Sequence, residues 1–235
     1  MNLMRLIVFL ILFIDVRANE QVRKLVDGAM EVLARSSVGT TTRQCSCLED
    51  GECIKVMQQQ GVHCANSCWR IFSQITNHPE MLFTCIATKA PVISNFIRCI
   101  SENLQSCVDT MQGPQIPKVD LKMMFTVGEQ RVVAARAEAI RNLAFESLRQ
   151  IGDVVMKFGS CVKTCFVEEQ NADGFCYDKK QCQPLVTQRN LRRALRRCLG
   201  GSSWKDHAAD SCECALKAGV RGVKDICALL KTMRG

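Results

Sequence analysis

Cysteine is the residue type in this chain with the widest chemistry, because its sulfur can form disulfides, bind a metal ion or act as a nucleophile. The sixteen cysteines divide into two groups of eight, and no cysteine occurs between residues 107 and 161. The first group is Cys45, Cys47, Cys53, Cys64, Cys68, Cys85, Cys99 and Cys107, and the second is Cys161, Cys165, Cys176, Cys182, Cys198, Cys212, Cys214 and Cys227. The even count in each group predicts eight disulfides, with every cysteine bonded inside its own group.

The other two chemistries fit the sequence poorly. Zinc sites usually combine short Cys or Cys/His clusters, whereas these cysteines show C-x-C and C-x3-C spacings and the three histidines are scattered. A sulfur held in a disulfide is not a thiolate and cannot attack a substrate. We therefore expect no metal site, no cofactor and no cysteine catalysis.

The N-terminal residues favour oxidised cysteines. Residues 1–5 carry one positive charge, residues 6–14 are apolar without interruption, and Ala18 ends the segment Val-Arg-Ala. This is the pattern of a secretory signal peptide, here residues 1–18. A membrane anchor is the alternative, but the apolar run would form a helix of about 14 Å, roughly half of a 30 Å hydrocarbon core. The sequence predicts a secreted, extracellular protein with no transmembrane segment, whose thiols meet an oxidising compartment.

A basic run in the second cysteine group is the clearest candidate binding site. Residues 188–199 read QRNLRRALRRCL. On a helix, one broad face would carry Arg189, Arg192, Arg193, Arg196 and Arg197, and the opposite face would be apolar. Guanidinium groups bind sulfate or phosphate oxygens in pairs, so this face predicts a polyanion site. The alternative is a solvated outer face whose aliphatic stems cover the core.

The composition indicates which partners to expect. The chain has a net charge of +8, which favours extracellular polyanions such as sulfated glycans, or acidic proteins. Nucleic acid is disfavoured by the predicted compartment and by the lack of aromatic residues beside the arginines. The sequence contains no H-E-x-x-H, no G-x-S-x-G and no phosphate-binding glycine loop, so we expect no enzyme activity.

Helical periodicity runs through most of the chain. Apolar residues recur at spacings of three and four over residues 20–35 and 54–72, and again after Pro91. Pro79 and Pro91 each stand where a helix can begin, because proline at the first helical position loses no hydrogen bond. Alternating strand patterns with paired turn residues are absent. We expect an all-α fold.

The cysteine-free stretch predicts how the two groups are connected. Residues 109–125 contain Gly113, Pro114 and Pro117 and are typical of a linker. Thr126 and Glu129 have the spacing of a capping box, and one apolar face continues to Phe158, so a long amphipathic helix is predicted. Such a face could be a coiled-coil seam or a membrane-binding surface, but a core-facing helix is the commoner case. The predicted organisation is a helical module over 19–108, the linker, and the long helix with a second helical module over 126–235.

The two groups of cysteines share part of their spacing. Cys64, Cys68 and Cys85 have the same separations as Cys161, Cys165 and Cys182, which suggests a duplication. In each C-x3-C pair the sulfurs lie one helical turn apart on the same face. We expect each pair to link its helix to two others, although eight cysteines allow 105 pairings and the sequence does not choose among them.

Several cysteine motifs resemble those of a known family. The segments CSCLEDGEC (45–53), CANSCW (64–69), CVKTCF (161–166) and GFC…CQPL (174–185) look like nematode cysteine-rich secreted proteins, in particular those with the chondroitin proteoglycan domain of type four. The likeness spans most of residues 45–230. It implies a helical, disulfide-rich extracellular protein, with some relatives being glycan-bearing parts of matrix or eggshell. The chain has neither a Ser-Gly dipeptide nor an Asn-x-Ser/Thr sequon, so the resemblance implies a domain homologue rather than a glycan carrier.

Two alternatives remain open. The order of helix, C-x-C, short gap, Cys and helix is also similar to the modules of the glial-derived neurotrophic factor receptor alpha family, which would imply a soluble ligand-binding module. The apolar helices alone would also suit a secreted helical lipid carrier. The favoured reading is a secreted, non-enzymatic protein that binds extracellular glycans or proteins.

Overall fold

The computed structural model describes residues 22–228, except for 142–145, 201–203, 221 and 225–226. The predicted signal peptide at residues 1–18 lies outside this range. The described chain is mostly α-helical and rich in disulfides, as expected. After a first helix over residues 22–35, the longer helices are α2 (Cys47–Cys68), α4 (Ala90–Leu104), α5 (Leu121–Arg141), α6 (Glu146–Thr164), α8 (Gln188–Gly200) and α9 (Trp204–Lys217). Shorter helical segments are the 3-10 helix η1 (Trp69–Gln74), α3 (Pro79–Ala87), the π-helical turn η2 (Cys165–Glu169) and α7 (Cys176–Lys180).

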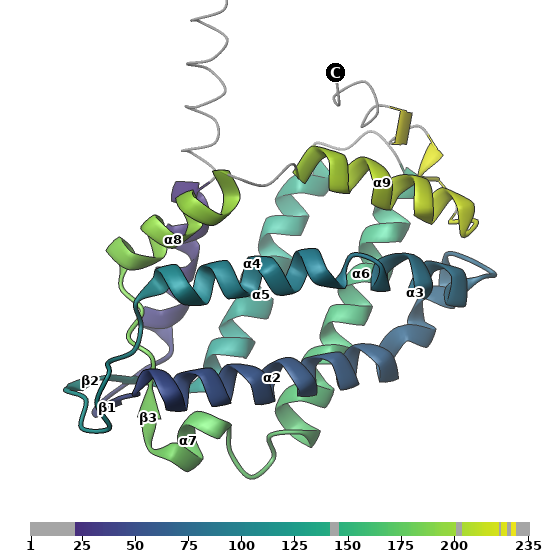
Figure 1. The fold of residues 1–235 in the computed structure, drawn as a ribbon. Helices are drawn as coiled ribbons and strands as arrows, with labels where there is room; N and C mark the ends of the chain where they lie inside the picture. Colours follow the sequence, from purple (N-terminus) through teal and green to yellow (C-terminus); the bar gives the residue numbers. More distant parts are fainter. Residues whose placement is uncertain (1–21, 142–145, 201–203, 221, 225–226, 229–235) are drawn as a thin grey trace, which may run out of the picture.

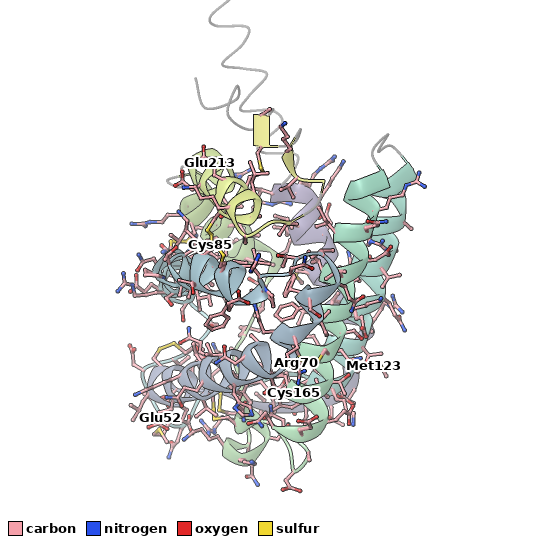
Figure 2. The ribbon with its side chains drawn as sticks, turned by 90° about the vertical axis from the view of Figure 1, so that its right-hand side faces the viewer. Glu52, Arg70, Cys85, Met123, Cys165 and Glu213 are labelled. Atoms are coloured by element: carbon pink, nitrogen blue, oxygen red, sulfur yellow. A yellow bond between two sulfur atoms is a disulfide. The ribbon has the colours of Figure 1, made fainter. Side chains whose placement is uncertain are left out.

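The helices form two crossed layers. In Figure 1, α2 and α4 run across the front of the molecule, and α5 and α6 stand behind them at a steep angle. Figure 2, turned by 90°, shows α5 and α6 as a separate layer beside the others. The helix α8 packs against α4, and α9 packs against α3. This crossing places α6 behind both α2 and α4.

Local sequence explains where these helices begin. Ser46 caps α2, because its hydroxyl accepts from the backbone N–H of Glu49 while the Glu49 carboxylate accepts from the backbone N–H of Ser46. The helix α3 starts at Pro79, and Pro91 lies in the first turn of α4. The two prolines therefore mark helix starts, as the sequence predicts.

A small sheet corrects the expectation that strands are absent. Strand β1 (Ser37–Gln44) pairs antiparallel with β2 (Gln115–Val119) and parallel with the two-residue strand β3 (Cys182–Gln183), in the order β2-β1-β3. The strand β2 lies inside the predicted linker. These strands are short and pair over long sequence separations, so no local hairpin turn marks them. The linker is thus ordered by pairing with β1.

The predicted long helix is also corrected, because the structure divides it into α5 and α6. The two helices run antiparallel, since Lys163 pairs with Glu129 at 2.7 Å and Arg136 pairs with Asp153. Each of the two antiparallel helices has an apolar stripe that faces the core. In the sequence these two stripes follow each other and look like the single stripe of one long helix. The predicted cap at Thr126 is wrong as well: α5 begins five residues earlier, after Asp120, whose carboxylate accepts from the backbone N–H of Met123 at 2.9 Å.

All sixteen cysteines form disulfides, but the predicted pairing within each group is wrong. Six bridges join the two groups, namely Cys45–Cys182, Cys53–Cys176, Cys64–Cys165, Cys68–Cys161, Cys85–Cys214 and Cys99–Cys198. Two remain within a group, Cys47–Cys107 and Cys212–Cys227. The two C-x3-C pairs face each other, so each pair links its helix to one neighbour rather than to two. The two halves are therefore cross-linked to each other at six places.

The buried apolar residues form two cores, which contact different ends of α6. The sheet-side core consists of Cys45, Cys53, Cys64, Leu121, Cys165, Phe166, Val167, Phe175, Tyr177 and Cys182. The α9-side core consists of Phe72, Ile75, Leu82, Val154, Ala218, Val220, Val223 and Cys227. Each core takes buried residues from before and after the cysteine-free stretch, so neither half buries its apolar residues alone.

Candidate functional site: the arginine face of α8

The basic run forms the helix α8, as expected from its periodicity. Its N-terminal end is closed by Thr187 and Asn190: the Asn190 backbone N–H donates to Thr187 Oγ1 at 3.3 Å, and the Thr187 backbone N–H donates to Asn190 Oδ1 at 2.8 Å. This reciprocal pair satisfies two backbone donors that a helix start leaves free. The cap fixes where α8 begins.

The opposite side of α8 is anchored to α4. Ala194 and Cys198 are buried, and Cys198 forms the disulfide with Cys99 of α4. Arg193 Nη1 donates to the side-chain oxygen of Gln105 at 2.6 Å, just after the end of α4. The helix is thus held by a covalent bond on one side, which leaves the arginine side facing outwards.

The structure brings all five predicted arginines to one site. Arg189, Arg192, Arg193, Arg196 and Arg197, together with Gln188, line a single open hollow of about 740 Å³. Arg192 is half-buried and the other four are exposed. Within the described part of the chain, none of the five guanidinium groups forms an ion pair with a carboxylate. Five positive charges therefore share one hollow, and Arg193 already uses one of its donors on Gln105.

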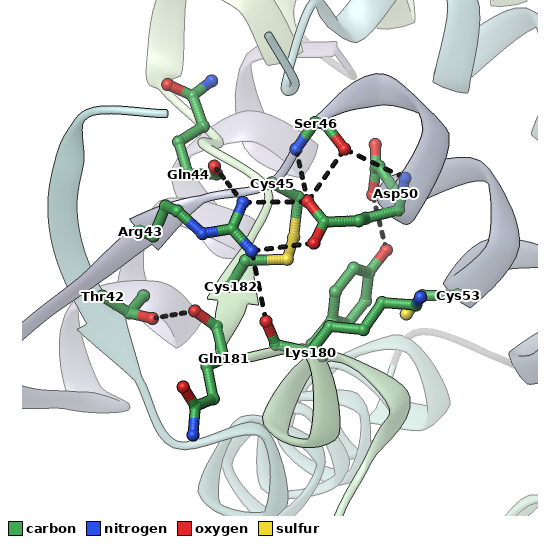
Figure 3. The surroundings of a disulfide bond; sticks show 12 residues. Thr42, Arg43, Gln44, Cys45, Ser46, Asp50, Cys53, Lys180, Gln181 and Cys182 are labelled. Atoms are coloured by element: carbon green, nitrogen blue, oxygen red, sulfur yellow. Dashed lines mark hydrogen bonds and ion pairs between the residues drawn. A yellow bond between two sulfur atoms is a disulfide. The ribbon is translucent and has the colours of Figure 1, made fainter. Parts of the chain in front are cut away.

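Several other charged residues of the described chain form structural pairs. The Arg43 guanidinium, which lies beside the Cys45–Cys182 disulfide in Figure 3, donates to both carboxylate oxygens of Glu49, at 2.9 and 2.8 Å. Hydrogen bonds from Arg43, together with those from Ser46, lower the pKa of Glu49 from 4.5 to about 2. Glu49 is 5% exposed, so this buried carboxylate stays ionised because it is paired.

A second buried carboxylate also has structural partners. Asp50 accepts from the Tyr177 hydroxyl at 2.6 Å and from the Ser106 hydroxyl at 3.2 Å. Burial and the bond to Asp50 raise the pKa of Tyr177. Tyr177 therefore stays protonated and acts as a buried hydrogen-bond donor that ties α7 to α2.

A second hollow was missed by the sequence analysis. An apolar groove of about 1040 Å³ lies between α2 and α4, with α6 at its base. The sequence feature that could have predicted this groove is the number of apolar residues in α2 and α4, which is larger than one buried face requires. Ile93 and Val62, for example, line the groove and are 53% and 63% exposed. The described part of the chain thus has a strongly basic hollow on α8 and an apolar groove between α2 and α4.

Two further observations bear on the kind of site. Among the described residues, no group of three or more His, Cys, Asp or Glu side chains is arranged to hold a metal ion. None of the described helices is both long enough and apolar enough to cross a membrane.

Comparisons with known proteins add no information about this site. The chain matches no protein-family model, no curated protein and no solved structure. The resemblance of its cysteine motifs to the chondroitin proteoglycan domain therefore stays a prediction. The role of the arginine face of α8 as a polyanion site likewise stays a prediction.

Proposed function

We propose that the protein is a secreted, non-enzymatic binding protein that holds sulfated glycans on the arginine face of α8. One observation carries the proposal: five arginines without carboxylate partners in the described chain line the same hollow. Planar guanidinium groups bind sulfate oxygens in pairs. A linear polysulfated chain can engage several of them at once, and each contact keeps the others close.

The surroundings of the hollow favour a sulfated glycan over nucleic acid. All its lining residues come from α8, and none is aromatic. Single-stranded nucleic acids are usually held by bases stacked on aromatic rings as well as by charge. Eight disulfides also suit an extracellular compartment, in which sulfated glycans are the abundant polyanions.

The family resemblance supports the same compartment but a different role from that of a proteoglycan core. Relatives with this kind of domain include glycan-bearing matrix proteins, whereas this chain lacks Ser-Gly and Asn-x-Ser/Thr. The protein is then a partner of glycans rather than their carrier. A soluble ligand-binding module like those of the neurotrophic factor receptors is the alternative, and no contact in the structure favours it over glycan binding.

Retention on a sulfated-glycan column tests the proposal. The oxidised protein should bind immobilised chondroitin sulfate or heparin at low salt and elute at moderate salt, because added salt shortens the screening length from about 10 Å at 0.1 M towards 3 Å at 1 M. Replacing Arg192, Arg193, Arg196 and Arg197 with glutamine should abolish retention, while glutamine maintains the helix.

A charge-matched variant separates the site from overall charge. Lys55, Arg70, Lys179 and Lys224 are exposed on other elements, and changing these four to glutamine removes the same charge. This variant should still be retained. Equal elution of the two variants, or no retention of the unchanged protein at low salt, would refute the proposal. A chondroitinase-sensitive loss of mass from the secreted protein would show instead that the chain carries a glycan.

A further inference from the structure

The apolar groove between α2 and α4 is a built feature of the fold. Its α2 wall is a single stripe, formed by Ile54, Met57, Gly61, Val62 and Ala65. Residues 54 and 65 are separated by eleven helical steps, so this wall is about 16 Å long. Ala90, Ile93 and Ile97 form the facing wall on α4, and Phe125, Val162 and Phe166 form part of the base.

Disulfides bond both walls of the groove to neighbouring elements. The helix α2 is bonded to α7 by Cys53–Cys176, to η2 by Cys64–Cys165 and to α6 by Cys68–Cys161. On the other side, Cys99–Cys198 fixes α4 to α8. No residue of α4 is buried, although its apolar residues would lose contact with water if it moved onto α2. Cys47–Cys107 links the start of α2 to the segment just after α4. The groove is open in the structure, and apolar side chains of both walls are exposed.

The groove has the properties of a site for hydrocarbon. Its volume of about 1040 Å³ is slightly above the usual range of about 300–1,000 Å³ for small-molecule sites, and such sites are mostly apolar with a few polar groups. The polar residues Gln58, Gln59 and Ser94 are exposed, which places them towards the mouth. A long, narrow chain with one polar end fits a 16 Å apolar wall with polar groups at its opening.

The charges at the base of the groove restrict which head groups the ligand can have. Lys163 is the one cation among the residues that line the groove, and its ammonium is bound to the Glu129 carboxylate at 2.7 Å. The pair is close to neutral, so the base offers no free charge to an anionic head group. Recognition must come from the apolar walls and depend on the length of the chain.

We propose that this groove binds the single long acyl chain of a free monomeric lipid, such as a fatty acid, with the head group left at the mouth. The walls cover the hydrocarbon, and each added methylene that enters the groove is removed from water. Affinity should rise with chain length until the groove is filled. A carboxylate and an alcohol of the same chain length should bind about equally, because Lys163 is already paired.

Binding of a fluorescent eleven-carbon fatty acid tests this proposal with the intact, oxidised protein, at concentrations below micelle formation. Emission should rise on binding, and unlabelled fatty acids and fatty alcohols of the same length should displace the probe equally well. Gly159 of α6 lines the groove, and a Cβ added there meets no atom within 4 Å. Gly159→Leu should therefore fill the groove without displacing neighbours and weaken binding at least tenfold. Leucine also favours a helix more than glycine does, so folding should be preserved.

Gly128→Leu is the matched control. Gly128 is a helical glycine of α5 with equally open surroundings, and it does not line the groove. This variant should bind the probe like the unchanged protein. The variant with four glutamines on α8 should also bind it normally, which separates this proposal from glycan binding.

Three results would overturn the proposal. The first is no binding by the unchanged protein, and the second is equal binding by the Gly159→Leu and unchanged proteins. The third is a dimer that Gly159→Leu abolishes, measured by sedimentation without lipid, since it would assign the groove to a second copy of the chain.

Discussion

Five of the ten buried residues in the sheet-side core are cysteines, whereas the α9-side core has one cysteine among eight. Aromatic rings meet in both cores: Phe125, Phe166 and Phe175 contact one another beside the cysteines of the sheet-side core, whereas the rings of the α9-side core have few cysteines around them. Trp69 contacts Phe72 and Phe158, with ring centroids 4.6 and 5.7 Å apart, and Phe72 contacts Phe158 at 4.9 Å. The sheet-side core therefore combines ring packing with many covalent bonds, whereas the α9-side core depends mainly on close packing.

Disulfides and aromatic packing stabilise the fold in different ways, because one acts mainly on the unfolded chain and the other on the folded chain. A disulfide acts largely by restricting the unfolded chain, so it contributes stability even where few apolar atoms are buried. Aromatic packing acts in the folded state and depends on filled space. The sheet-side core also contains two buried carboxylates, Glu49 and Asp50, each with hydrogen-bonding partners. Covalent links there hold helices together despite this polar content.

Phe72→Ala should give the largest single loss of stability. The Phe72 side chain is buried in the α9-side core between Trp69 and Phe158, and its removal leaves a cavity that rigid neighbours fill only in part. Such substitutions typically cost about 3–5 kcal/mol. Denaturant unfolding should show this as a lower midpoint with an unchanged slope, because the unfolded chain keeps all its cross-links.

Phe96→Ala is the control for this prediction. Phe96 is 37% exposed on α4 and belongs to neither core, so its loss should cost much less. A Phe72→Ala variant as stable as the Phe96→Ala variant would show that ring packing does not hold the α9-side core.

Removing one bridge from the sheet-side core should have the next largest effect. Cys53 and Cys176 link α2 to α7, and changing both to alanine should cost about 2–5 kcal/mol. Here the unfolding slope should rise as the midpoint falls, because the unfolded chain expands and exposes more surface. This change in slope distinguishes a cross-linked core from a packed one.

The short bridge Cys212–Cys227 provides the comparison. It closes a separation of 15 residues, against 123 for Cys53–Cys176. Its loss should change the slope less, since a short loop restricts the unfolded chain less. The remaining bridges shorten the loop that each of these two disulfides closes in the unfolded chain. The test is therefore which of the two double variants shows the larger change in unfolding slope. If both double variants unfold with the slope of the unchanged protein, the proposed action on the unfolded chain is wrong.

The sequence predicted the helical class and the arginine face because both depend on local periodicity. Arginines three and four residues apart lie on one side of any helix, whatever its neighbours. The starts of α3 and α4 were predicted for a similar reason, since proline acts on the backbone at its own position. Helix capping at Ser46 follows the same local logic, with Glu49 at the required spacing.

The pairing of cysteines depended on packing and could not be read locally. The matched C-x3-C motifs suggest two separate modules, yet Cys64 bonds Cys165 and Cys68 bonds Cys161. Exchanging the matched positions, 64 with 161 and 68 with 165, turns each of these bridges into the other. Matched spacing thus gives two helices complementary rows of sulfurs, which lets them bond to each other when they pack side by side. The division of the long helix into α5 and α6 was missed because an apolar stripe does not show where a chain reverses.

Acid should weaken the sheet-side core through Glu49, by the smallest of the three effects. Its pKa is lowered from 4.5 to about 2 by the hydrogen bonds from Arg43 and Ser46. A carboxylate with a lowered pKa in the folded state contributes its full stability above its ordinary pKa. That contribution is lost as the pH falls from about 5 to 2, when the folded protein must also take up the proton. At 1.36 kcal/mol per pKa unit, it is up to about 3 kcal/mol.

Glu49→Gln isolates this contribution from those of other carboxylates. The variant keeps the shape of the side chain but cannot titrate, so it should be less stable than the unchanged protein at pH 7 and nearer to it at pH 2. The difference between the two free energies of unfolding, measured in urea at each pH, should shrink mainly between pH 5 and 2. A parallel substitution at Glu52, which is exposed and pairs with Lys180, should give a small difference, because exposed ion pairs contribute about 0–1 kcal/mol. If the difference in free energy of unfolding between Glu49→Gln and the unchanged protein stayed constant from pH 5 to 2, the charge of the Arg43–Glu49 pair would not stabilise the sheet-side core. The larger number of disulfides would then be what distinguishes this core from the α9-side core.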